Sequence, residues 1–443
     1  MSYPKFLSLR SDPPIGEANR VNLPTLSAED LADVPLIIPG QGVFLFTTIS
    51  ATISATISAT VSKDSCSYSI MNAAQTDGII VEWMSDKVQV MRSTSLIPYV
   101  DPTNSKGLTD KKEAFYWFSI DAQNQRFYAG VGEARKETKV YEYILSYATD
   151  DERKANKAFL ESLTTIGSFK QVTPLKLLRD PITRILPHRV KHELSLDSLA
   201  KGLYMPKSHL SAVSQQMYEC VQHCVLDTDD FPEFSQAIKQ SIADGWCKER
   251  LLEKSGEFSK EGRPPGFGRP PGLDPNVDET YLRITLGENN GESPGIPYVL
   301  EIWPAGHYSP IHSHGGAEAI IKVLHGDIHV KLFPFLSDSC DSFLSADFTK
   351  DDLAWISPNL NQTHQLQNRS AEEPCMTIQC YMYSALEDKT HYDYFNYLDN
   401  TNTVQKYEPD SDMDFVAFKE LMREEWYNRK PNTMFSCLRM FHM

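Results

Sequence analysis

Short apolar runs separated by turn residues occupy residues 281–383, and this pattern restricts the fold of that region more than any other feature of the chain. The runs read YLRITLG, PYVLEIW, AIIKVLHGDIHVKLFPF, DLAWISP and CMTIQCYMY, with Gly, Pro and Asn between them. Gly326 and Asp327 predict a tight turn within the third run. Many short strands joined by turns form an antiparallel barrel or a double-sheet jelly roll. We therefore expect a β-barrel domain over residues 276–400.

A second β-rich region is expected over residues 35–148. Its runs GIIVEWM, KVQVMRS, AFYWFSID, QRFYAGVGE and KVYEYIL are rich in β-branched and aromatic residues, and DAQNQ predicts a hairpin connection. Residues 43–62 alternate Ile and Ala with Ser and Thr, which favours a long strand or a strand pair. The region is predicted to be β-sandwich-like. It shows no catalytic constellation, so its role stays open to an unidentified ligand or protein partner. Residues 1–34 are expected to form an arm ahead of it.

Residues 149–255 change to a helical period. In SHLSAVSQQMYECVQHCVL the apolar residues recur every three or four positions, and DTDDFPEFSQAIKQSIADGW repeats the pattern after an Asp that could cap the helix. We expect this helical segment to pack on the barrel. The stretch EGRPPGFGRPPGLDP, within the Pro/Gly-rich loop 256–275, is either a surface excursion or a polyproline motif for a partner. Residues 401–443 are expected to hold one helix and a tail, so the chain is predicted to be mainly β with helices.

The net charge of −16, from 43 Lys and Arg against 59 Asp and Glu, argues against nucleic acid as the main partner, because phosphate binding requires a basic surface. No stretch approaches the roughly 20 apolar residues that span a bilayer. The N-terminal segment lacks the apolar core of a signal peptide. Eight cysteines in 443 residues do not suggest a disulfide framework. We expect a cytoplasmic protein with neither a nucleic-acid nor a membrane partner.

Two histidines in YSPIHSHGGAEAIIKVLHG form the strongest candidate site. On a strand, His312 and His314 point to the same face, because successive side chains alternate. His364, in WISPNLNQTHQLQN, is the best third ligand from a facing strand. Three neutral imidazoles around a divalent ion leave coordination positions for substrate, as a catalytic site requires. The alternative is a surface pair, the commoner environment of an isolated His-x-His. His329, by its alternation, is expected to point outward.

The same stretches resemble known motifs. GHYSPIHSHGGAEAIIKVLHG is similar to the first cupin motif, and ISPNLNQTHQLQN is similar to the second. YLRI, HGDIHVKLF and PCMTIQCYMYS resemble segments of the cysteine dioxygenase family. The resemblance as a whole covers about residues 205–395. It implies a C-terminal cupin domain, a jelly-roll barrel, that binds ferrous iron, Fe²⁺, through His312, His314 and His364. It further implies a thiol dioxygenase that converts cysteine or a small mercaptocarboxylate to its sulfinate with dioxygen.

The resemblance also implies roles for residues outside the metal site. Arg283 would bind the substrate carboxylate, Tyr381 would be the catalytic tyrosine, and Tyr281 and Gln379 would contribute to substrate binding. An arginine fork can grip a carboxylate through two hydrogen bonds, and a phenol can hydrogen-bond to bound sulfur or oxygen. Ala319 stands where animal enzymes carry a cysteine that crosslinks to the tyrosine, so no such thioether can form here.

Two alternatives stay open. Glu318 matches the acidic fourth ligand of ordinary cupins, and a site of three histidines and one glutamate would favour a lyase, an isomerase or a carbon oxygenase. The other expectation for Glu318 is a hydrogen bond to a ligand histidine. Gln379 replaces a histidine that orients the tyrosine, and a neutral amide cannot shuttle a proton. That change, with the unassigned first 150 residues, favours a non-catalytic cupin kept as a binding module.

Overall fold

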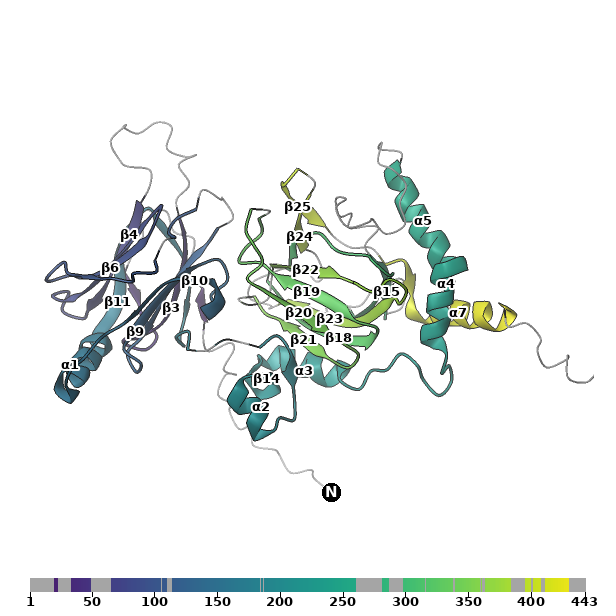
Figure 1. Ribbon diagram of the computed structural model, residues 1–443, viewed down its shortest axis with the longest axis horizontal. Helices are drawn as coiled ribbons and strands as arrows, with labels where there is room; N and C mark the ends of the chain where they lie inside the picture. Colours follow the sequence, from purple (N-terminus) through teal and green to yellow (C-terminus); the bar gives the residue numbers. More distant parts are fainter. Residues whose placement is uncertain are drawn as a thin grey trace, which may run out of the picture.

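The computed structural model describes residues 20–22, 33–48, 65–104, 106–109, 114–183, 185, 187–259, 281–286, 298–314, 316–337, 339–358, 360, 363–383, 395–399, 401–407 and 411–429. Most of the expected N-terminal arm, the Ser/Thr-rich repeat beyond Thr48, the Pro/Gly-rich loop from residue 260 and the C-terminal tail lie outside the described residues. The described chain forms two β-rich lobes that stand beside each other (Figure 1).

The first lobe consists of two antiparallel six-stranded sheets. In spatial order, one sheet contains β1 (Arg20–Asn22), β12 (Val172–Leu178), β3 (Gln41–Thr48), β8 (Tyr116–Asp121), β9 (Arg126–Val131) and β10 (Lys139–Ile144). The other contains β2 (Val34–Pro35), β11 (Leu163–Lys170), β4 (Ser65–Asn72), β5 (Gly78–Met84), β6 (Val88–Arg92) and β7 (Pro98–Tyr99). Hairpins join β4 to β5, β5 to β6 and β8 to β9.

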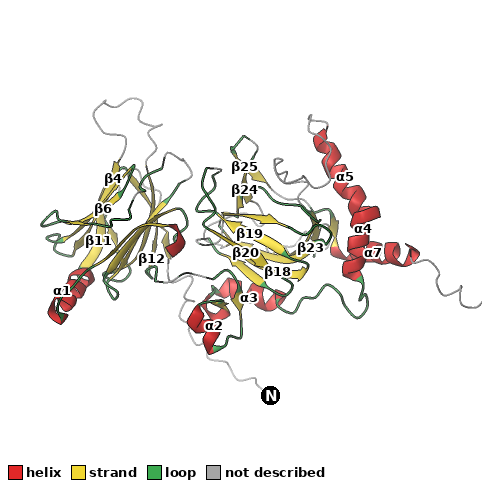
Figure 2. Cartoon of the chain, viewed as in Figure 1, coloured by secondary structure: helices red, strands yellow, loops and turns green. Residues whose placement is uncertain are grey.

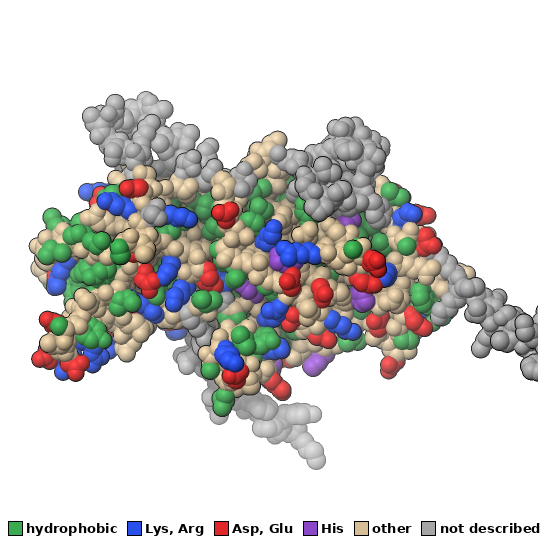
Figure 3. Space-filling view, viewed as in Figure 1, with side chains coloured by type: hydrophobic (Ala, Val, Ile, Leu, Met, Phe, Trp, Pro, Cys, Tyr) green, Lys and Arg blue, Asp and Glu red, His purple; other side chains and the backbone are tan. Residues whose placement is uncertain are grey.

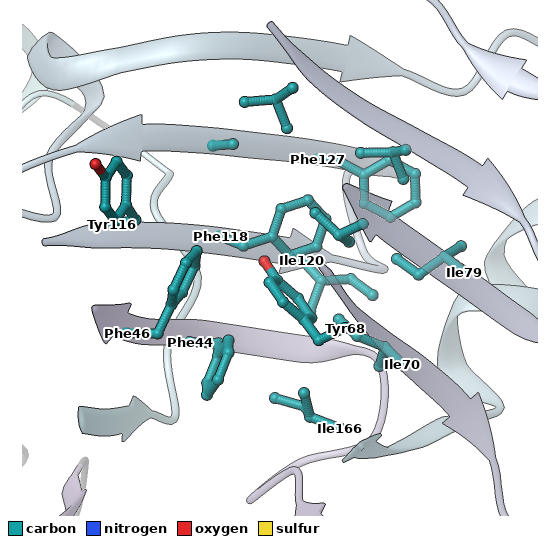
Figure 4. Packing of buried hydrophobic residues seen from close by; sticks show 14 of the residues in the cluster. Phe44, Phe46, Tyr68, Ile70, Ile79, Tyr116, Phe118, Ile120, Phe127 and Ile166 are labelled. Atoms are coloured by element: carbon teal, nitrogen blue, oxygen red, sulfur yellow. The ribbon is translucent and has the colours of Figure 1, made fainter. Parts of the chain in front are cut away.

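An aromatic core between these sheets explains why the region folds as a sandwich. Phe46 on β3 stacks on Tyr116 of β8 with 5.6 Å between ring centroids, and it meets the edge of Trp83 on β5 at 5.7 Å. Phe44 and Tyr68 extend the same cluster across the gap between the sheets (Figure 4). Large rings that interlock in this way bury much apolar area per residue. The predicted β-sandwich is therefore present.

Residues 163–178 correct the predicted helical segment. β11 lies between β2 and β4, and β12 lies between β1 and β3, so both strands belong to the sandwich. Their β-branched residues fit a pleated sheet better than a helix. The helix in this part of the described chain is α1 (Asp150–Glu161), whose start is fixed by a capping box between Thr149 and Glu152. The first lobe thus runs past the predicted boundary at residue 148.

The second lobe is a barrel of two facing sheets. One contains β21 (Leu353–Ile356), β18 (Ala317–His325), β23 (Cys375–Tyr383), β16 (Tyr298–Trp303), β15 (Leu282–Thr285) and β26 (Met413–Asp414). The other contains β20 (Leu344–Phe348), β19 (Ile328–Leu332), β22 (Thr363–Gln367), β17 (His312–Ser313), β24 (Phe395–Leu398) and β25 (Val404–Tyr407). Because β25 and β26 join these sheets, the barrel extends past the expected end at residue 400.

Helices flank the second lobe (Figure 2). α3 packs on β18 and β23, α4 packs on α5 and α7, and α7 also contacts β15. Their bounds are α2 (Leu196–Lys201), α3 (Ala212–Val221), α4 (Phe234–Asp244), α5 (Trp246–Ser259) and α7 (Phe415–Arg429). The remaining elements are the 3₁₀ helices η1 (Lys136–Thr138) and η2 (Lys207–His209) and the short parallel pair β13 (Val190–Lys191) and β14 (Met205–Pro206). The helices expected within residues 208–245 and at the C-terminus are therefore present.

On the face that Figure 3 shows, acidic and basic side chains are interspersed over both lobes, without an extended basic area. Among the helices of the described residues, none is both long and apolar enough to cross a membrane.

The segment between β19 and β20 connects the two lobes. Phe335 leaves the barrel and packs in the aromatic core of the first lobe. The backbone N–H of Glu133 donates to the carbonyl oxygen of Pro334 at 2.7 Å. The guanidinium of Arg135, which is buried, lies 5.5 Å from the ring centroid of Phe343. We name residues 333–337 and 339–343 the docking segment, because Pro334, Phe335 and Phe343 within them contact the first lobe.

Candidate metal centre

Three histidines converge inside the barrel. β17 pairs with β22 in antiparallel register, which sets His312 directly opposite His364. The Nε2 atom of His364 lies 3.0 Å from that of His312 and 3.3 Å from that of His314. The three residues are 5%, 3% and 4% exposed for His312, His314 and His364. The structure therefore brings together the three predicted ligands as a buried cluster that could hold a metal ion.

The protonation of His312 and His364 suits a divalent cation. His312 Nδ1 lies 3.0 Å from the carbonyl oxygen of Pro310. A carbonyl can only accept, so Nδ1 carries the proton and the lone pair of Nε2 points into the cluster. Burial of His364, together with the neighbouring imidazoles of His312 and His314, holds its pKa well below the usual value. Neutral imidazole nitrogens that share one small space are a donor set for a metal ion.

Glu318 does not join this cluster, which corrects the expectation of a fourth ligand. Its carboxylate accepts hydrogen bonds from the hydroxyls of Ser211 and Ser214, the second at 2.7 Å, and both serines belong to the start of α3. Alternation along β18 places Ala317 and Ala319 on the inner face and Glu318 on the face that α3 covers. Glu318 is buried, but as an anchor for the helix.

A chain of polar contacts leads from Arg283 to the histidines. Nη1 of Arg283 lies 3.5 Å from Oε1 of Glu301, its register partner on the neighbouring strand. The other carboxylate oxygen of Glu301 accepts from the amide nitrogen of Gln379. The amide oxygen of Gln379 in turn accepts from the Tyr381 hydroxyl. The Tyr381 ring stacks on the imidazole of His314 with 5.2 Å between centroids. Three of the predicted substrate-site residues thus lie in one connected network.

Tyr281 occupies a different place from the other predicted substrate residues. Its ring packs on Trp303 at 4.8 Å between centroids, in an apolar cluster with Ile328 and Leu366.

His329 is a buried histidine outside the cluster, although it was expected to point outward. It is 6% exposed and bonds through Nδ1 to Asp347 at 2.6 Å. The reason is that the carboxylate of Asp347 on β20 gives the imidazole a polar partner near the barrel edge.

An apolar cavity of about 40 Å³ reaches the histidine cluster. Its walls include Ile321, Val330, Phe348, Trp355 and the candidate ligand His364. Such a volume corresponds to a few water-sized groups at about 10–15 Å³ each. The cavity is therefore large enough for a small apolar molecule beside His364.

Sequence reasoning missed Glu301 and the serine pair that holds Glu318. Glu301 is the one acidic residue in the apolar run PYVLEIW, and this is the signal that could have identified it. A charge within a buried strand requires a partner. The identity of that partner depends on strand register. Arg283 and Glu301 are 18 residues apart in sequence, and the register of their strands sets them opposite each other.

Comparisons with known proteins address the fold only. No family model and no curated protein sequence matches the chain. Among solved structures, a sugar phosphate isomerase of the cupin superfamily from Silicibacter pomeroyi has 15% identity and a TM-score of 0.21, covering 29% of this chain and 77% of its own. The cupin domain of Cnp3 from Schizosaccharomyces pombe has 17% identity and a TM-score of 0.21, covering 27% and 74%.

A cupin domain of a transcriptional regulator from Enterobacter cloacae has 16% identity and a TM-score of 0.19, covering 24% of this chain and 98% of its own. These scores are too low to assign a family or a function. The fold assignment stands on the strand order and register described above. The chain is thus mainly β with helices, and its second lobe is a double-sheet barrel that encloses three buried imidazoles able to bind a metal ion.

Proposed function

We propose that the protein is a mononuclear iron-dependent thiol dioxygenase. The single observation that supports this most is the cluster of His312, His314 and His364 without a carboxylate, since Glu318 is held by α3. Three neutral ligands leave three positions of an octahedral ion for substrate and dioxygen. In the reaction, a thiol and dioxygen give a sulfinic acid: both oxygen atoms end on sulfur, which loses four electrons, and no further reductant is needed.

When bound, ferrous iron would supply positions where a thiolate and dioxygen meet, and its charge would favour loss of the thiol proton. The residues of the chain provide the surroundings. Pro310 fixes the tautomer of His312, as described above. Tyr381 stacks its ring on His314, where it can position a bound substrate. The apolar walls of the cavity beside His364 offer few hydrogen-bond partners to water on that side of the site.

The test is oxygen consumption by protein reconstituted anaerobically with ferrous iron, with product identified as a sulfinate by mass spectrometry. The panel contains cysteine, 3-mercaptopropionate, 2-aminoethanethiol and 2-mercaptoethanol. We expect consumption of one dioxygen per sulfinate with at least one of them, and none with the His364→Ala variant. No consumption with any thiol, while one iron per chain is measured in the same sample, would exclude the proposal.

The other two interpretations make different predictions in the same experiment. A lyase, isomerase or carbon oxygenase depended on Glu318 as a ligand, and its hydrogen bonds to Ser211 and Ser214 remove that support. A non-catalytic binding module predicts stable protein that retains neither iron nor another divalent metal after dialysis. Metal analysis of the purified protein separates this outcome from the dioxygenase.

A further inference from the structure

We propose that Glu301 determines the substrate class of this site: a thiol that carries a protonated amine and no free carboxylate. This inference rests on the proposed function and deepens it. The sequence expectation of a mercaptocarboxylate depended on Arg283 as the group that binds the substrate carboxylate. The structure gives Arg283 an internal carboxylate instead.

The first step concerns charge. Arg283 and Glu301 are 4% and 3% exposed, and they face each other across paired strands. Nη1 of Arg283 lies 3.5 Å from Oε1 of Glu301, so the pair presents no net charge to the histidine cluster. A buried charge pair of this kind is costly to break, because each partner would be left uncompensated. A substrate carboxylate would have to approach Arg283 against the like charge of Glu301.

The second step concerns hydrogen-bond direction. A carboxylate only accepts, so the group that Gln379 turns toward Glu301 must be its NH₂. The same NH₂ lies 3.2 Å from the hydroxyl oxygen of Thr377. The amide oxygen therefore faces Tyr381, and the phenol donates its single proton to it. Glu301 thereby sets the direction of the whole row of hydrogen bonds.

The two steps together describe what a bound substrate would meet. With its proton directed at Gln379, the Tyr381 oxygen can act toward the histidine side only through its lone pairs. A lone pair recognises a donor such as an ammonium group and repels a carboxylate. The neutralised Arg283 adds no compensating attraction for an anion. Glu301 is thus a specificity residue that acts through Arg283 and Gln379 and need not touch the substrate.

The experiment measures binding separately from turnover. The protein is loaded with Co²⁺ without oxygen and titrated with 2-aminoethanethiol and 3-mercaptopropionate, which have the same two-carbon spacer and opposite charge, and with neutral 2-mercaptoethanol. The sulfur-to-cobalt absorption band gives the Kd of each thiol. We expect the amine to bind at least tenfold more tightly than the carboxylate. Tighter binding of 3-mercaptopropionate, or no binding of any thiol, would overturn the proposal.

Two variants locate the effect. Glu301→Gln keeps the size of the side chain and an acceptor for Gln379 but removes the charge, and it should lower the amine-to-carboxylate ratio at least tenfold. Glu318→Gln removes a second buried carboxylate of the same barrel, on the face covered by α3, and should leave the ratio unchanged. An unchanged ratio in Glu301→Gln would contradict the proposal. If that variant does not fold, the ratio in the unmodified protein still decides.

Failure of the inference and failure of the proposed function have different signatures. If the iron form oxidises 3-mercaptopropionate in preference to 2-aminoethanethiol, the function stands and the role of Glu301 is wrong. If the cobalt form prefers the amine but the iron form consumes no oxygen with any thiol, the charge preference stands and the dioxygenase assignment is wrong.

Discussion

Substitution of Gly132 by alanine should lower the free energy of unfolding by weakening the contact between the two lobes. Gly132 has φ +84, and a Cβ built on it would lie 2.2 Å from the carbonyl oxygen of Pro334 in the docking segment. The left-handed backbone costs an alanine about 1–2 kcal/mol. The clash is with backbone, so the docking segment must move, which disrupts the Glu133 N–H bond to Pro334, worth about 1 kcal/mol. It also withdraws Phe335 from its core, where complete loss of a phenylalanine side chain costs about 3–5 kcal/mol.

The expected total for Gly132→Ala is about 4 kcal/mol or more, even if only part of the Phe335 contribution is lost. Gly202→Ala is the matched control, because Gly202 also has a left-handed backbone, φ +63, but nothing lies within 4 Å of its Cβ position. It should cost only about 1–2 kcal/mol. Urea unfolding followed by tryptophan fluorescence, to which the fully buried Trp83 and Trp117 of the first lobe contribute, measures the difference. Equal losses in the two variants would show that the docking segment does not press on Gly132 in solution.

Three further predictions concern the second lobe. His364→Ala should lose bound divalent metal on dialysis, whereas His329→Ala, a buried histidine outside the cluster, should retain it, as measured by elemental analysis. Glu318→Ala should also retain metal but lower the free energy of unfolding by about 2–3 kcal/mol, since two serine hydroxyls lose a charged acceptor; loss of metal would restore Glu318 as a ligand. Asp412→Ala should lower it by about 3–5 kcal/mol, because this buried carboxylate accepts from Arg250, Lys254 and a backbone N–H of β15. A loss below about 1 kcal/mol in calorimetry would contradict that role.

The histidine cluster was predictable because its geometry is local. His312 lies on β17 and His314 follows directly after the end of that strand, and the two side chains, only two residues apart, reach the same cluster. His364 was the best remaining candidate on another strand, and the register of β17 with β22 confirms the convergence.

The position of Glu318 could not be predicted by counting residues from the histidine pair. The chain turns after His314, where the backbone N–H of Ala317 donates to the His314 carbonyl at 3.0 Å. β18 begins at Ala317, so its alternation starts anew and is not continuous with that of β17. Motif spacing measures distance along the chain, but it does not say which face a residue takes beyond a turn.

The helical prediction for residues 163–178 failed for a related reason. The helical period that is real in α3 and α4 is expected over the whole of residues 149–255, including the interval between α1 and α3. Within that interval Ser168 and Gln171 have positive φ, at 54° and 57°, which a helix does not permit. The strands that hold β11 and β12 in sheets are β4 and β3, whose paired residues, such as Ile70 for Ile166 and Thr48 for Val172, lie far earlier in the chain, beyond the range of any local pattern.

The docking segment sets a lower limit on the piece of this chain that can preserve the site. Leu332 pairs with His364, and three residues later Phe335 is anchored in the aromatic core of the other lobe. A barrel expressed without residues 33–178 would leave the benzyl group of Phe335 in water and release the end of the strand that faces a candidate ligand. A shortened form of this protein is therefore expected to keep the site only if it contains both lobes.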